Sequence, residues 1–102
     1  AFCADNDNIA LGACKALQEH GYKIPEDISV IGFDDMPFCK ISTPPLTTIR
    51  VFKEEMGAMA VKRLVDVIKN SRTVKMKTQI CTEFIERASV KRLNDSWKGQ
   101  EI

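Results

Sequence analysis

The stretch I-S-V-I-G-F-D-D-M-P-F-C-K-I-S-T-P-P-L-T-T-I-R, residues 28–50, decides the fold. Its first five residues are rich in β-branched side chains and apolar on both faces, which is typical of a strand buried on both sides of a parallel sheet. Two carboxylates, Asp34 and Asp35, follow where that strand should end. Because ligands of open α/β sheets bind beyond the carboxyl ends of the strands, this acidic pair is the first candidate for a binding site. Residues 46–49 are predicted to form a second extended piece, after prolines that disfavour helix.

Length and composition bound the class of protein. The chain has 102 residues, 44% hydrophobic and 28% charged, as expected for one compact soluble unit at most. A formal net charge of +1 gives no sign of a nucleic-acid-binding surface. No apolar run approaches the ~20 residues of a transmembrane helix, and no signal peptide is visible, although the abrupt start indicates a missing N-terminus. The cysteines lack C-x-x-C spacing, so we expect small buried thiols in a reducing cytoplasm. They are Cys3, Cys14, Cys39 and Cys81.

A first helix is predicted over residues 7–20, after the capping residues D-N-D-N at 5–8. Gly21 should end it in the left-handed conformation. On a helical wheel one broad arc is apolar, and Leu11 is the misfit that falls among the polar residues. A lone exposed leucine is ordinary, but it also suits a helix whose outer face contacts a partner. The expected apolar arc consists of Ile9, Ala10, Ala13, Cys14, Ala16 and Leu17.

A second helix is predicted from residue 52 or 53 to residue 70, with Glu54 and Glu55 favourably placed in its first turn. Alternation over residues 74–84 predicts an amphipathic strand near a sheet edge. Residues 88–102 lose periodicity, so we expect a polar, mobile tail that contains Trp97. The expected buried face of the second helix consists of Met56, Ala60, Val61, Leu64, Val65, Val67 and Ile68.

This order of elements predicts an α/β fold with a three-layer arrangement around a parallel sheet and right-handed crossovers. Only about three to five strands are available, and the strand at residues 28–32 needs apolar cover on both faces. We therefore expect the chain to be the C-terminal part of a larger α/β protein.

Motifs narrow the chemistry. Nucleotide-binding glycine motifs are absent from the sequence, and His20 has no identifiable catalytic partner, so a surface or packing role is expected for it. A magnesium site at Asp34 and Asp35, as in a phosphate-accepting receiver domain, stays open as an alternative. Asn6 and Asp34 each follow a strand of the same sheet and should meet in one crevice, where an amide and a carboxylate can fix sugar hydroxyls or a purine edge. Helix capping is the simpler explanation for residues 5–7.

Three ordered segments resemble the lactose-repressor/galactose-repressor (LacI/GalR) family. They are C-A-D-N-D-N-I-A-L-G-A at 3–13, P-E-D-I-S-V-I-G-F-D-D-M-P at 25–37 and T-P-P-L-T-T-I-R at 43–50. The resemblance covers roughly residues 1–87 and implies the periplasmic-binding-protein-like type I fold, with residues 1–87 as the C-terminal lobe of the effector-binding core and 88–102 as a tail. Members of the family are dimeric transcription regulators with an N-terminal helix-turn-helix. That head and most of the other lobe are expected to lie outside this chain.

The resemblance also implies roles for particular residues. Asn6 matches an asparagine at the pocket rim, and Asp34 matches the carboxylate that hydrogen-bonds the effector. Lys53 and Met56 fall at helix positions that line the pocket in some members. A bulky apolar or aromatic residue is frequent at the Lys53 position, so lysine is a departure that favours an anionic ligand such as a sugar phosphate. Positions that face the partner subunit are matched by Leu11 and Ile41.

The expected function is therefore that of a cytoplasmic, effector-responsive repressor that is not an enzyme and has no cofactor or metal. Its expected partners are a small effector (a sugar, a sugar phosphate or a nucleobase-like compound), a second copy of the chain, and operator DNA through the absent head. No membrane partner is expected. The alternative is a periplasmic sugar-binding protein of a transport system, against which the P-P-L-T-T-I segment and the expected free thiols argue.

Overall fold

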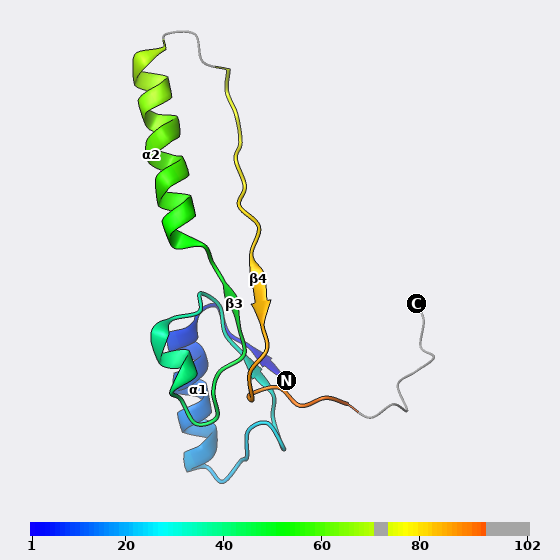
Figure 1. Cartoon of the computed structure of the whole chain (residues 1–102). Helices are drawn as coiled ribbons and strands as arrows, with labels where there is room; N and C mark the ends of the chain where they lie inside the picture. Colours follow the sequence, from blue (N-terminus) through cyan, green and yellow to red (C-terminus); the bar gives the residue numbers. More distant parts are fainter. Residues whose placement is uncertain (71–73, 94–102) are drawn as a thin grey trace, which may run out of the picture.

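Short parallel strands form the centre of the molecule. The computed structural model describes residues 1–70 and 74–93. Strand β1 (Phe2–Cys3) pairs in parallel with β2 (Val30–Ile31). On the other side of β2 lies β3 (Thr48–Arg50). Two isolated parallel bridges, Ile31 with Thr47 and Asp34 with Arg50, connect the two segments. The structure is thus α/β with parallel strands, as the sequence predicts (Figure 1).

Helix α1 (Asp7–Glu19) confirms the first predicted helix. The Asn6 side chain caps it by accepting a hydrogen bond from Ile9 N at 2.9 Å, and Gly21 follows it with φ +86°. The buried face is rotated from the predicted arc, because Ile9 is exposed whereas Leu11 is half-buried against the core. The expectation of an exposed Leu11 on a polar face was therefore wrong: the body covers α1 on the side where Asp7 also lies.

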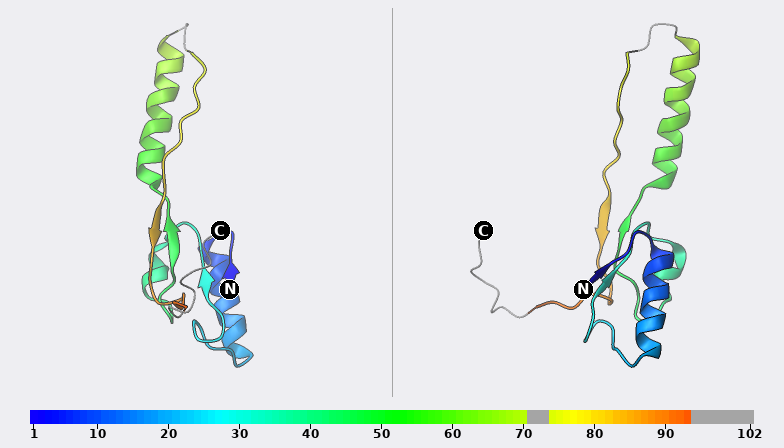
Figure 2. Two further views of the ribbon diagram at one scale, coloured as in Figure 1. Left: turned by 90° about the vertical axis from the view of Figure 1, so that its right-hand side faces the viewer. Right: turned by 180° about the vertical axis from the view of Figure 1, so that it is seen from behind.

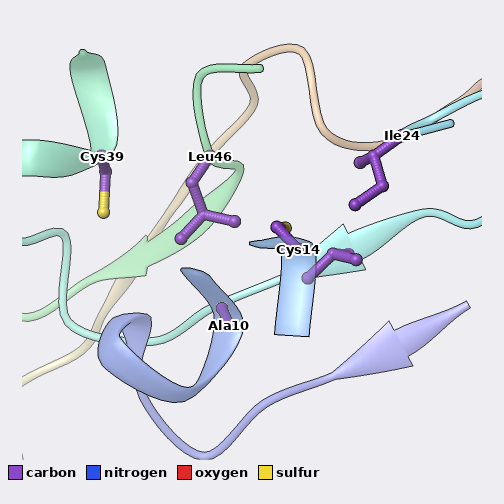
Figure 3. Packing of buried hydrophobic residues seen from close by; sticks show 6 residues of the cluster. Ala10, Cys14, Ile24, Cys39 and Leu46 are labelled. Carbon is purple, nitrogen blue, oxygen red and sulfur yellow. The ribbon is translucent and has the colours of Figure 1, made fainter. Parts of the chain in front are cut away.

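A small core fills the space between α1 and the strands. Six buried apolar residues form it. Figure 3 labels five of them, which come from α1, from the loop after α1, from the 3-10 helix η1 (Pro37–Lys40) and from the segment that follows η1. Leu46 and Val30 are the largest fully buried apolar side chains. The core consists of Ala10, Cys14, Ile24, Val30, Cys39 and Leu46. It contains two of the four cysteines; the exposure of Cys3 and Cys81 contradicts the expectation that all four are buried, while all four are free thiols.

We call residues 1–50 and 83–93 the body and residues 51–82 the arm. Helix α2 (Lys53–Lys69), in the arm, projects away from the body (Figures 1 and 2). Its bounds match the prediction, but its expected buried face is wrong, because no residue of α2 is buried. An amphipathic pattern shows which face is apolar without showing what covers it. Residues 74–82 run back beside α2 without forming a regular strand, and only the end of the predicted strand, β4 (Glu83–Ile85), joins a sheet. β4 pairs with β3 in antiparallel register.

The chain after β4 is anchored along the body. Ala88 N donates to Pro45 O at 3.0 Å, Val30 N donates to Ser89 O at 2.9 Å, and Lys91 N donates to the Ser29 hydroxyl at 2.9 Å. These contacts differ from the expected mobile tail, which was placed from residue 88 onward. Trp97 lies outside the described residues. No helix in the described part of the chain has the length and apolarity needed to cross a membrane.

Candidate functional site

The turn after β2 carries the acidic pair in an unusual backbone conformation. Asp34 has a backbone φ of +121° and Asp35 one of +60°, values that residues other than glycine rarely adopt. Such a turn persists only where its surroundings fix it. Here Asp34 N donates to Ile49 O at 2.8 Å, and Met36 N donates to Asp7 Oδ2 at 2.7 Å. The turn is thus held on one side by β3 and on the other by α1.

Asp7 is a buried structural carboxylate. It is fully buried, and its second oxygen, Oδ1, accepts a hydrogen bond from Thr48 Oγ1 at 2.6 Å. A side chain on Gly32 would overlap Asp7 Oδ1, so a glycine is needed there. Burial, followed by the neighbouring Asp7 carboxylate, raises the pKa of the Cys39 thiol to about 12, which keeps it protonated at neutral pH. For Asp7 the sequence suggested only a capping role, and the structure shows that Asn6 caps the helix instead.

Three of the four predicted ligand-binding residues lie at one edge of the strands. Asp7 N donates to Phe33 O at 3.1 Å, which places Asn6 and Asp34 on either side of this contact. The Lys53 ammonium group donates to the backbone carbonyl of Asp34 at 3.0 Å. Asn6 uses Oδ1 for the cap, which leaves its NH₂ group as the donor it can offer a ligand.

Met56 lies instead in a groove of about 340 Å³ between α2 and the returning chain. Most of the lining is apolar and comes from α2 and from residues 76–80. Met56 thus lies in apolar surroundings, unlike the polar edge at Asp34. The lining residues are Met56, Met59, Ala60, Arg63, Met76, Thr78 and Ile80.

Asp35 is held by two arginines that sequence reasoning did not single out. Its Oδ2 accepts from Arg50 Nε at 2.8 Å and its Oδ1 pairs with Arg87 Nη2 at 2.7 Å, leaving the Asp35 side chain 9% exposed. Burial raises the pKa of this carboxyl, but hydrogen bonds and charge from Arg50 and Arg87 outweigh burial, so the pKa lies below its usual range. With both oxygens paired to arginine, Asp35 is poorly suited to the magnesium-binding alternative. Arg50 stands inside the quoted stretch, but no local pattern links Asp35 to Arg87.

The two predicted interface residues occupy different environments. Ile41, at the end of η1, is 83% exposed, whereas Leu11 is half-buried against the subunit's own core. Ile41 is therefore the freer of the two to meet another surface.

Comparison with known proteins places the chain. A family model described as a periplasmic binding protein-like domain matches residues 1–90. The lactose operon repressor of Rhizobium radiobacter is 44% identical over 92 residues, which are 90% of this chain and 80% of that protein. A LacI family transcriptional regulator of Enterococcus faecium, solved with bound ribose, matches with TM-score 0.81 and 35% identity over 90% of this chain. The lac repressor dimer bound to operator and an anti-inducer matches with TM-score 0.81 and 33% identity over 86% of it.

These matches define the class first: the chain carries a periplasmic-binding-protein-like domain. It spans 34% of the Enterococcus regulator and 30% of the lac repressor chain, so those solved relatives are about three times as long as the matching region. The chain belongs to the LacI family of transcriptional regulators.

Proposed function

We propose that this chain is part of the effector-binding core of a DNA-binding transcriptional repressor, and that a sugar or sugar derivative binds at the edge formed by Asn6, Asp34 and Lys53. The main support for this proposal is the fixed turn at Asp34, whose backbone is hydrogen-bonded to β3 and to the Lys53 side chain. A turn held in place beforehand loses little conformational freedom when its side chain binds a ligand.

The chemistry of this edge suits a polyhydroxy ligand. A sugar hydroxyl donates to the Asp34 carboxylate and accepts from the Asn6 amide, while the Lys53 ammonium group attracts an anionic substituent such as a phosphate. The Enterococcus relative with bound ribose supports a sugar as the ligand class. Lys53 supports a charged sugar derivative over a neutral one.

The exposed face of α2 supports a second lobe. Apolar side chains left in water over a whole helix are the mark of a surface that another part of the protein covers. We propose that the rest of the effector-binding core, from sequence outside this chain, covers α2 and the groove that contains Met56. Residues 53–70 and 74–82 then belong to the second lobe, which departs from the expectation that residues 1–87 form the C-terminal lobe, and β3 and β4 are the strands that cross between the lobes. The exposed apolar residues of α2 include Met56, Met59, Val61, Leu64, Val65, Val67 and Ile68.

A ligand between two lobes acts as a switch only through different affinities for their open and closed arrangements. In a dimer that carries N-terminal helix-turn-helix heads, closure would change the spacing of the heads on operator DNA. The solved lac repressor dimer on its operator supports this part of the proposal. Such a protein works in the cytoplasm and needs no bond-making chemistry. The alternative, a periplasmic sugar-binding protein of a transport system, shares the fold, but the matching relatives named above are repressors or transcription regulators.

The test uses the full-length protein and a fixed panel of D-ribose, cellobiose, glucose 6-phosphate and hypoxanthine. Calorimetry should detect binding of at least one sugar, and Asp34→Asn should weaken it by roughly 1.5–3 kcal/mol, the scale of a charge-assisted hydrogen bond. Operator binding without ligand should persist in this variant. Glu26→Gln, in the exposed loop after α1, is the matched control and should bind like the parent. Unchanged affinity in Asp34→Asn would remove this residue from the site.

A further inference from the structure

Asp35, Arg50 and Arg87, which we name the Asp35 clasp, join three separate segments of the chain. Asp35 belongs to the ligand-facing turn, Arg50 is the last residue of β3, and Arg87 lies two residues after β4. Arg50 also lies 3.7 Å from Glu83, its partner in the β3–β4 register. The clasp therefore connects the turn to both strands that lead to the α2 arm.

Two of the three side chains of the clasp are largely shielded from water. The Arg87 side chain is 12% exposed and also donates from Nη1 to Leu46 O at 3.0 Å, while the Arg50 side chain is 38% exposed. The ion pairs between a poorly exposed carboxylate and two arginines are costly to break, because each group that loses its partner keeps an uncompensated charge. In contrast, the nearby pair of Glu86 and Arg92, at 3.8 Å and largely exposed, should contribute little.

Backbone strain explains why the turn needs this support. Asp34 and Asp35 both have positive φ, and such residues return to ordinary conformations when their surroundings stop fixing them. The Asp35 side chain holds this two-residue stretch through ion pairs with Arg50 and Arg87, and the Asp34 carbonyl also accepts a hydrogen bond from Lys53. A relaxed turn would move the Asp34 carboxylate away from the position that a ligand meets.

We propose that Asp35 is a positioning residue for effector binding: through Arg50 and Arg87 it holds the Asp34 turn in its binding conformation and fixes that turn to the two strands that cross to the arm. Asp35 itself does not touch the ligand. This inference rests on the proposed function for its binding readout, but the order of the turn is measurable without any ligand.

The experiment compares Asp35→Asn, Arg50→Gln, Arg50→Lys and the control Glu86→Gln in the full-length protein. Hydrogen–deuterium exchange of the peptide spanning residues 33–37 is measured without ligand. We expect exchange to rise about tenfold in Arg50→Gln and more in Asp35→Asn, to recover in Arg50→Lys, which keeps the charge, and to stay unchanged in Glu86→Gln. Arg50 is partly exposed, so its variants keep the test valid if Asp35→Asn fails to fold.

The second readout separates positioning from general stability. Affinity for the panel sugar that binds the parent protein should fall about tenfold in Arg50→Gln, while operator affinity without ligand stays unchanged. Unchanged exchange in both Arg50→Gln and Asp35→Asn would overturn the proposal, as would an equal loss of ligand and operator affinity. A negative result for Asp34→Asn would contradict the proposed site alone, because the ligand-free exchange measurement does not depend on it.

Discussion

Ser89 and Val30 are hydrogen-bonded twice. Val30 N donates to Ser89 O at 2.9 Å, and the Ser89 hydroxyl donates to Val30 O at 2.6 Å. The same hydroxyl accepts from Thr47 N at 2.8 Å, and Ser89 is fully buried. One side chain after β4 thus joins β2 to the residue preceding β3, so the segment that follows β4 is part of the body.

Ser89→Ala should therefore destabilise the body by about 1–3 kcal/mol, because Thr47 N loses its partner inside the protein. The free energy of unfolding in urea measures the effect. Ser29→Ala is the control: its hydroxyl accepts one exposed hydrogen bond from Lys91 N, and its loss should cost about 0.5–1 kcal/mol. Equal effects of the two substitutions would contradict the role assigned to Ser89.

Gly32→Ala should be more harmful than a methyl group usually is. The new Cβ would overlap Asp7 Oδ1 and lie 3.0 Å from Leu46 Cδ2, so the buried Asp7 would have to move. We expect a loss of about 1–3 kcal/mol in unfolding free energy. Gly12→Ala, on α1 with nothing within 4 Å of its Cβ, should instead gain up to ~1 kcal/mol from helix propensity. A neutral Gly32→Ala would show that Asp7 is not fixed.

Ile41 is the better test of the predicted dimer interface. Because it is 83% exposed, Ile41→Asp should leave the subunit fold intact while it shifts the dimer toward monomer in sedimentation at micromolar concentration. Leu11→Ala should also favour monomer, but it removes packing from the subunit's own core and so lowers the melting temperature as well. Asn8→Asp adds the same charge at another exposed position as a control. An undiminished Ile41→Asp dimer would place Ile41 outside the interface.

The Asp35 clasp should stabilise the folded protein at neutral pH and lose this effect in acid. The folded-state pKa of Asp35 lies below the unfolded value of about 3.9, so the carboxylate's stabilisation is complete above that value and is lost as the pH falls through the folded-state pKa. Asp35→Asn should thus melt at a lower temperature than the parent between about pH 5 and 7, with the gap closing below about pH 4. Calorimetry across this range measures it, and a gap that does not change with pH would argue against the ion pairs.

Local patterns in the sequence predicted both helices to within a residue or two, because caps such as Asn6 and the stop at Gly21 are local features. The expectation that Asn6 and Asp34 lie close together also came from the order of strands and loops, whereas Lys53 was suggested only by the family resemblance. The errors involve contacts between distant residues. The apolar face of α2 gave no information about its cover, and the partners of Asp35 and Ser89 lie far away along the chain. Loss of periodicity after β4 suggested a tail, whereas Ser89 is anchored by its backbone carbonyl and its hydroxyl, contacts that no local pattern reveals.

The pairing of Arg50 with Glu83 in the β3–β4 register has a consequence for the topology. Residues 51–82 leave the body and rejoin it at neighbouring positions, so the arm is an insertion into a hairpin. A two-residue Asn-Gly turn could join Arg50 directly to Glu83, since such turns match the twist of antiparallel strands. The shortened chain would keep α1, the four strands of the described residues and both arginines that bind Asp35. We therefore expect the part of the chain outside residues 51–82 to fold without them.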